Sequence, residues 1–106
     1  MLEPHRLAEA RSLAYHRAVA ERLPRHPDLV ERARARARAW QAVSFVPEYA
    51  REWERLLALP VAALQRAMVE ESDSGDARRQ ASPFAGALDP RARWKLWREV
   101  RERLER

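Results

Sequence analysis

Seven prolines divide this 106-residue chain into short segments, and their spacing restricts the possible folds more than any other feature. Proline suits the first turn of a helix but disrupts a helix interior. The stretches between the prolines are rich in Ala, Leu, Arg and Glu, which are strong helix formers. The sequence therefore predicts an all-α fold, a compact single-domain bundle of about five or six short helices over residues 1–106.

The spacing of apolar residues predicts where these helices lie. We expect helices at residues 4–23, 27 to just past 40, 48 to before Pro60, Pro60 to about Met68, and 90–104. In the second of them, the arginines at positions 32, 34 and 38 are expected on the solvated side. Residues 70–76 are polar and rich in turn formers, so we expect an exposed loop there, followed by at most one helical turn at 77–80.

The segment from Ser82 to Leu88 follows neither a helical nor a strand period, although it contains Phe84. We expect it to be ordered but non-regular. Asp89 then provides an N-cap before Pro90, which introduces the last helix. The apolar residues of that helix, Trp94, Leu96, Trp97, Val100 and Leu104, cover an arc of about 160°. Such an arc is wide for a terminal helix that has one surface to cover.

Length and composition indicate one domain with a modest core. Much of the 46% hydrophobic content is alanine, so side-chain packing must depend heavily on the four tryptophans. The chain has no cysteine, no apolar run of the roughly 20 residues that span a bilayer, and no basic start followed by an apolar stretch at residues 1–5. We expect a cytoplasmic protein without a membrane segment.

The chain is basic, with a formal net charge of +5, and Lys95 is the only lysine among its 21 basic residues. Arginine forms forked contacts to carboxylates and phosphates, so this bias is compatible with an acidic protein or a nucleic acid as partner. A GC-rich or thermophilic genome would produce the same bias. Residues 90–106 contain seven basic and three acidic residues. The three glutamates are spaced to form i, i+3 and i, i+4 pairs with arginines, as on an ordinary solvated helix.

No residue pattern predicts an active site or a cofactor. Acid–base catalysis requires a carboxylate with a shifted pKa, and the pairs Glu52/Glu54 and Glu70/Glu71 lie on polar surfaces. The three histidines, at positions 5, 16 and 26, lack metal-ligand spacing, and the chain has only two glycines for a phosphate loop. We therefore expect a protein that is not an enzyme and has no metal or cofactor.

One motif carries an alternative. Arg11 and His16, with four residues between them, resemble the Arg-x(4–6)-His signature of HEPN ribonucleases, in which an all-helical dimer cleaves RNA. Ser12 follows the arginine, whereas that family usually has Asn, Asp or His there, and the family motif usually lies late in the chain. A chance match is easy in a chain so rich in arginine. The alternative interpretation is a surface arginine beside a partly buried histidine.

Three segments carry a further resemblance: SPFAGALDPRARW at residues 82–94, SLAYHR at 12–17 and WERLL at 53–57. Together they resemble a family of short bacterial helical proteins, encoded beside a nucleotidyltransferase-like protein in toxin–antitoxin gene pairs. The resemblance spans most of the chain, and the Ser-Pro-Phe-Ala-Gly stretch is its most distinctive part. It implies a non-catalytic, antitoxin-like regulator that binds the toxin or nucleotidyltransferase-like partner.

The wide apolar arc indicates where such a partner binds. We expect aromatic and leucine anchors surrounded by arginines that pair with partner carboxylates. The predicted partner-binding residues are Phe84, Leu88, Arg91, Arg93, Trp94, Trp97 and Arg98. The same apolar residues could instead seal the chain's own core, and this alternative applies more to Trp94 than to Trp97. A homodimer through this helix and a nucleic-acid-binding module both remain open.

Overall fold

The structure, a computed structural model, describes residues 3–106 and contains six α-helices and no strand within that range. Met1 and Leu2 lie outside the described residues. They belong to residues 1–5, which were considered above as a possible export signal. The helices are α1 (Pro4–Arg22), α2 (Pro27–Trp40), α3 (Glu48–Leu57), α4 (Val61–Met68), α5 (Asp73–Gln80) and α6 (Pro90–Glu105). The all-α prediction is confirmed.

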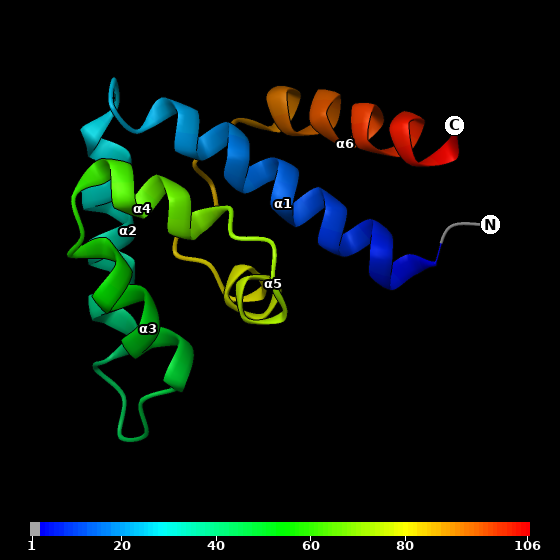
Figure 1. Ribbon diagram of the computed structural model, residues 1–106. Helices are drawn as coiled ribbons and strands as arrows, with labels where there is room; N and C mark the ends of the chain where they lie inside the picture. Colours follow the sequence, from blue (N-terminus) through cyan, green and yellow to red (C-terminus); the bar gives the residue numbers. More distant parts are fainter. Residues whose placement is uncertain (1–2) are drawn as a thin grey trace.

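The longest helix, α1, organises the molecule (Figure 1). The helices α4 and α5 pack against one side of α1, while α6 runs back along α1 in the opposite direction. The helix α2 packs against α3. Among the described helices, α6 packs on α1 alone, so much of its circumference faces away from the rest of the protein.

Proline starts three of these helices as predicted. It occupies the first turn of α1, α2 and α6, where its missing N–H group costs no helical hydrogen bond. On α2, Ala33 and Ala37 are buried, and their small side chains let α3 approach closely. The core is completed by large side chains that are almost fully enclosed, namely Val19, Leu23, Trp53, Leu57, Leu64, Met68, Phe84 and Val100.

Arg34 departs from its predicted place on the solvated side of α2. Its Nε and Nη2 atoms donate to the carbonyl oxygen of Leu57, at 3.2 and 2.9 Å, and its Nη1 donates to Glu31. Leu57 is the last residue of α3, where carbonyl groups have no partner within the helix. Arg34 therefore caps α3 from the neighbouring helix.

The fifth helix corrects the expectation for residues 70–80. α5 begins at Asp73, inside the stretch that was expected to be an exposed loop. Ser72 is its N-cap, since the Ser72 hydroxyl accepts a hydrogen bond of 3.0 Å from the backbone N–H of Gly75. Asp73 and Asp76 occupy the first turn, where their negative charge interacts favourably with the helix dipole. Turn-forming residues thus act here as a helix start.

Gly75 is buried in α5 because the chain passes directly over it. A Cβ atom at this position would lie 2.1 Å from the backbone oxygen of Glu70. We expect Gly75→Ala to lower the free energy of unfolding by about 1–3 kcal/mol, although alanine is the better helix former. Urea denaturation measures this change. Ser74→Ala, an exposed control on the same helix, should change stability by less than about 0.5 kcal/mol, and equal effects at both positions would contradict the close contact.

The segment between α5 and α6 is non-regular, as predicted, and is held by defined contacts. It contains a turn in which Ala87 N–H donates to the Phe84 carbonyl oxygen at 3.1 Å. Gly86 has a φ of +80°, a conformation that side chains disfavour. No helix in residues 3–106 combines the length and the apolar character that crossing a bilayer requires.

Candidate functional site

Tyr15 of α1 holds the segment 82–88 against the helix bundle. Its hydroxyl donates to the carbonyl oxygen of Phe84 at 2.6 Å and accepts from the backbone N–H of Ala87 at 3.1 Å. Both bonds join residues about 70 positions apart in the sequence. They satisfy polar backbone groups of a segment that has no helix or sheet to do so.

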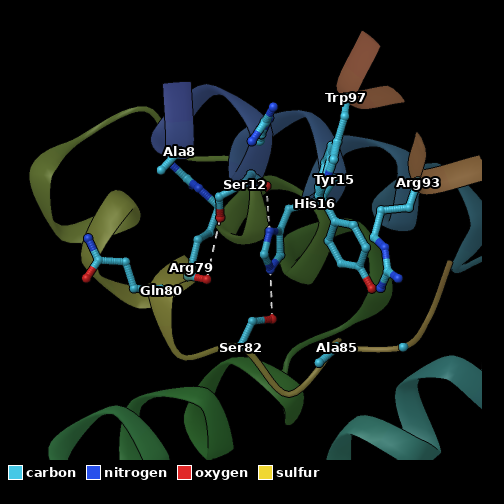
Figure 2. A pocket seen from close by; sticks show the side chains of 12 residues that line it. Ala8, Ser12, Tyr15, His16, Arg79, Gln80, Ser82, Ala85, Arg93 and Trp97 are labelled. Atoms are coloured by element: carbon cyan, nitrogen blue, oxygen red, sulfur yellow. Dashed lines mark hydrogen bonds between the residues drawn. The ribbon is translucent and has the colours of Figure 1, made fainter. Parts of the chain in front are cut away.

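His16, the next residue of α1, makes a second connection to this segment (Figure 2). Its Nδ1 lies 2.7 Å from the carbonyl oxygen of Ser12, and its Nε2 lies 2.7 Å from the hydroxyl of Ser82. A carbonyl oxygen only accepts, so Nδ1 carries the proton and Nε2 accepts from Ser82. The Ser82 hydroxyl in turn accepts from the Phe84 N–H at 3.1 Å.

The environment of His16 keeps the imidazole neutral. The pKa of His16 is lowered from 6.5 to about 4, mainly by burial and to a smaller extent by the nearby Arg79 charge, whereas the hydrogen bond to Ser12 opposes the shift. A base with so low a pKa is poorly matched to removing a proton from serine near pH 7. Although His16 and Ser82 are arranged like a base and a nucleophile, their contact is best explained as a structural hydrogen bond.

Trp53 of α3 packs against residues of both connections, His16 and Phe84. Its ring stacks on His16 with centroids 6.2 Å apart, and the ring of Phe84 meets it edge-on at 5.9 Å. Its Nε1 donates to the carbonyl oxygen of Arg78 at 3.0 Å. The segment 82–88 is therefore part of the core rather than an external loop.

This packing corrects two of the predicted partner-binding residues. Phe84 is 2% exposed and Leu88 is 4% exposed, and both belong to the main core cluster. Their apolar side chains are used by the chain's own fold because the bonds to Tyr15 and His16 pull the segment inward. They offer no surface to a partner while this packing persists.

A cavity of about 440 Å³ opens beside this network, and we name it the Arg11–Arg93 cavity. Its walls come from α1, the end of α5, the segment 82–88 and α6. In Figure 2, Arg93 and Trp97 reach it from α6 on one side, Arg79 and Gln80 lie on the other, and the His16–Ser82 bond lies between them. Three arginines line this cavity, and no acidic residue of the described chain does.

The three arginines differ in how far their charge is compensated. Arg79, whose side chain is 1% exposed, pairs with Asp76 at 2.7 Å and donates to the carbonyl oxygens of Met68 and Glu70. It closes the end of α4 and is already satisfied, apart from its Nε. Arg11 and Arg93 form no ion pair within residues 3–106, so they leave the cavity positive.

Arg11 is the more constrained of these two side chains. Its guanidinium lies over the ring of Trp97, 5.8 Å from the centroid, in a cation–π arrangement that connects α1 to α6. Its Nε is buried and has no hydrogen-bond partner. A buried donor without an acceptor is unusual in native proteins.

A second surface lies on the outer side of α6, and we call it the Trp94 face, defined by Arg91, Trp94, Lys95 and Arg98. All four residues are exposed, and Trp94 is 67% exposed. The three cations form no ion pair with other described residues. The predicted residues Arg91, Trp94 and Arg98 thus lie together.

The order of the two tryptophans is the reverse of the expectation. Trp97 is half-buried, packs against the core cluster and lies 6.3 Å from the Tyr15 ring, whereas Trp94 faces away. Arg93 also turns inward, toward the cavity. The predicted set therefore divides among the core, the cavity and the outer face of α6.

The other residues considered as catalytic or metal-binding candidates are the glutamate pairs, the HEPN-like motif and the histidines. Glu52 and Glu70 both accept hydrogen bonds from the guanidinium of Arg78, at 2.9 and 2.8 Å, so both carboxylates are engaged in an ion-pair network. Arg11 and His16 of the HEPN-like motif line the same cavity, but both ring nitrogens of His16 are occupied. Over residues 3–106, no three His, Asp or Glu side chains gather as metal ligands would.

Sequence reasoning missed Ser82 and Arg79. Ser82 was noted only as part of the distinctive segment, and its position two residues before Phe84, typical of a serine that accepts a nearby backbone N–H, was the available signal. The burial of Arg79 could not be predicted, because nothing in the local sequence distinguishes it from the many exposed arginines of this chain. Comparison of the chain with protein-family models, curated proteins and solved structures found no match in any of the three.

Proposed function

We propose that this chain is a protein-binding regulator that engages an acidic partner protein through the Trp94 face. The observation that carries the proposal is the 67% exposure of Trp94 on a helix that packs on α1 alone. An exposed tryptophan leaves a large apolar surface in water, and tryptophan is among the residues most enriched at the centres of interfaces.

The charges around Trp94 specify the kind of partner. Arg91, Lys95 and Arg98 flank the indole along α6 and form no ion pair within residues 3–106. An acidic surface with an apolar socket would bury the ring and pair with these cations. In line with its resemblance to antitoxin-like proteins, we propose a toxin or nucleotidyltransferase-like protein as the partner, restrained by this contact.

The first experiment identifies the partner. The tagged protein is recovered from extract of its source cells, with and without nuclease, and the co-purifying proteins are identified. A stoichiometric protein that survives nuclease supports the proposal if Trp94→Ala reduces its recovery. Recovery of nuclease-sensitive material alone would instead favour nucleic-acid binding. A dimer of the purified chain that depends on Trp94 would make a second copy the occupant of this face.

With the purified partner, we expect Trp94→Ala to weaken binding by about 30-fold, as for a tryptophan at an interface centre. Titration calorimetry measures the change. Phe45→Ala is the matched control, since Phe45 is 90% exposed and lies in the connection between α2 and α3, away from α6 (Figure 1). Binding that is equally tight in both variants would rule out the Trp94 face.

A further inference from the structure

We propose that the Arg11–Arg93 cavity binds a small organic phosphate, with the phosphate group held by Arg11 and Arg93 and the organic part against Trp97. This site is distinct from the Trp94 face, because Arg93 and Trp97 line the cavity whereas no residue of the Trp94 face does. The proposal does not depend on the protein partner.

The electrostatics of the cavity select an anion. Arg11 and Arg93 approach from two different helices, while Arg79 is compensated by Asp76. No carboxylate of the described chain lines the cavity. Two uncompensated guanidinium groups match the charge of a phosphate monoester, which is about −1.5 to −2 near neutral pH, better than that of a single carboxylate.

The hydrogen-bonding groups point to the same class of ligand. Arg11 forms no ion pair within residues 3–106, so its terminal N–H groups can donate to a phosphate oxygen. The hydroxyl of Ser12 also lines the cavity and makes only a long contact of 3.5 Å to the carbonyl oxygen of Arg79. It is therefore available as a further donor to the phosphate group.

The size and the apolar walls indicate that the phosphate carries an organic group. About 440 Å³ is within the range of small-molecule sites and exceeds what a bare phosphate ion fills. Trp97 is held in place by the Arg11 guanidinium and by the neighbouring Tyr15 ring, so it offers a rigid aromatic wall. Ala8 and Ala85 are small apolar residues of the same lining.

Phenyl phosphate is a suitable probe, compared with inorganic phosphate, benzoate and phenol by titration calorimetry of the full chain at constant salt. We expect phenyl phosphate to bind about tenfold more tightly than inorganic phosphate, because its ring is partly buried against Trp97. Benzoate should bind more weakly than phenyl phosphate, and phenol should show no saturable binding. Tighter binding of benzoate would overturn the assignment of a phosphate ligand.

Charge-removing variants test the named residues. Arg11→Gln and Arg93→Gln should each weaken phenyl phosphate binding by about tenfold or more, as expected for the loss of a charged hydrogen bond. Arg51→Gln, on the exposed surface of α3, removes the same charge away from the cavity and should leave affinity within about twofold. Equal losses in all three variants would show nonspecific attraction to a basic protein, and would overturn the site.

Two further measurements separate this proposal from folding defects and from the partner proposal. Circular dichroism and urea denaturation establish that the glutamine variants are folded. Trp94→Ala should bind phenyl phosphate with unchanged affinity, since its side chain does not line the cavity. A loss in that variant equal to the loss in Arg93→Gln would overturn the separation of the two sites.

Discussion

Replacing Trp53 by alanine should lower the free energy of unfolding by about 3–5 kcal/mol, the usual cost of deleting a large aromatic side chain from a core. Trp53 has no exposed surface and contacts the rings of His16 and Phe84. The substitution also leaves the carbonyl oxygen of Arg78 without its 3.0 Å hydrogen bond. For a domain of ordinary stability, this is a large part of the total.

Urea denaturation of matched variants checks this expectation. Trp94→Ala makes the same chemical change at an exposed position and should alter stability by less than about 0.5 kcal/mol. Trp53→Phe keeps most of the apolar volume and loses the N–H donor, so an intermediate cost is expected even if Trp53→Ala does not fold. Equal costs at Trp53 and Trp94 would contradict the packing described here.

The Trp53 variants should also loosen the segment 82–88. The edge of the Phe84 ring rests on Trp53, and the amide of Ala87 is protected through Tyr15. Hydrogen exchange at Ala87 should therefore accelerate in Trp53→Phe relative to an amide near the middle of α6, a helix that packs on α1 and not on α3. Unchanged exchange at Ala87 would show that packing against Trp53 does not protect the segment 82–88.

Acidification from pH 6.5 to pH 4 should remove about 3 kcal/mol of stability through His16 alone. Burial lowers the pKa of His16 from 6.5 in the unfolded chain to about 4 in the folded protein. Between these values the unfolded chain binds a proton that the folded protein does not, so acid favours unfolding. The stabilisation is complete above pH 6.5 and is lost as the pH falls through the folded value.

Urea denaturation at a series of pH values measures this dependence. Carboxylates also titrate in this range, so the informative quantity is the difference between the wild type and His16→Gln, which removes the buried imidazole. The variant should be less stable at pH 7 but should lose less stability toward pH 4. His26→Gln changes an exposed histidine and should retain the wild-type pH dependence. Parallel curves for the wild type and His16→Gln would contradict the buried, neutral imidazole.

The division of roles on α6 explains its wide apolar arc. Leu96, Trp97 and Val100 pack inward toward α1 and the core, while Trp94 lies at the exposed edge of the same arc, beside basic residues. The arc is wide because it combines a sector that folds the protein with a residue that does not. We infer that the outer residue contributes to binding, and the variants above separate its contribution from that of the inner sector.

Local chemistry made the helices predictable. Prolines at helix starts, the Asp89 cap and the apolar spacing of α1 placed most boundaries within a few residues of those observed. The start of α5 was missed because Ser, Asp and Gly favour loops and helix starts alike. Contact with the rest of the chain decided between them, since Gly75 is the residue that lets the backbone of Glu70 pass closely.

Local patterns in the sequence were sufficient to predict the all-α class, five of the six helices in order, the non-regular segment before α6 and the basic, tryptophan-containing character of that helix. Contacts between distant residues were needed to show that Trp97 is half-buried and Trp94 exposed, that Phe84 belongs to the core, and that Arg11 and Arg93 share a cavity. The physical reason is that periodicity places residues on one helix face, whereas burial depends on which neighbour covers that face. His16 and Ser82 are 66 positions apart, and no local pattern specifies such a contact.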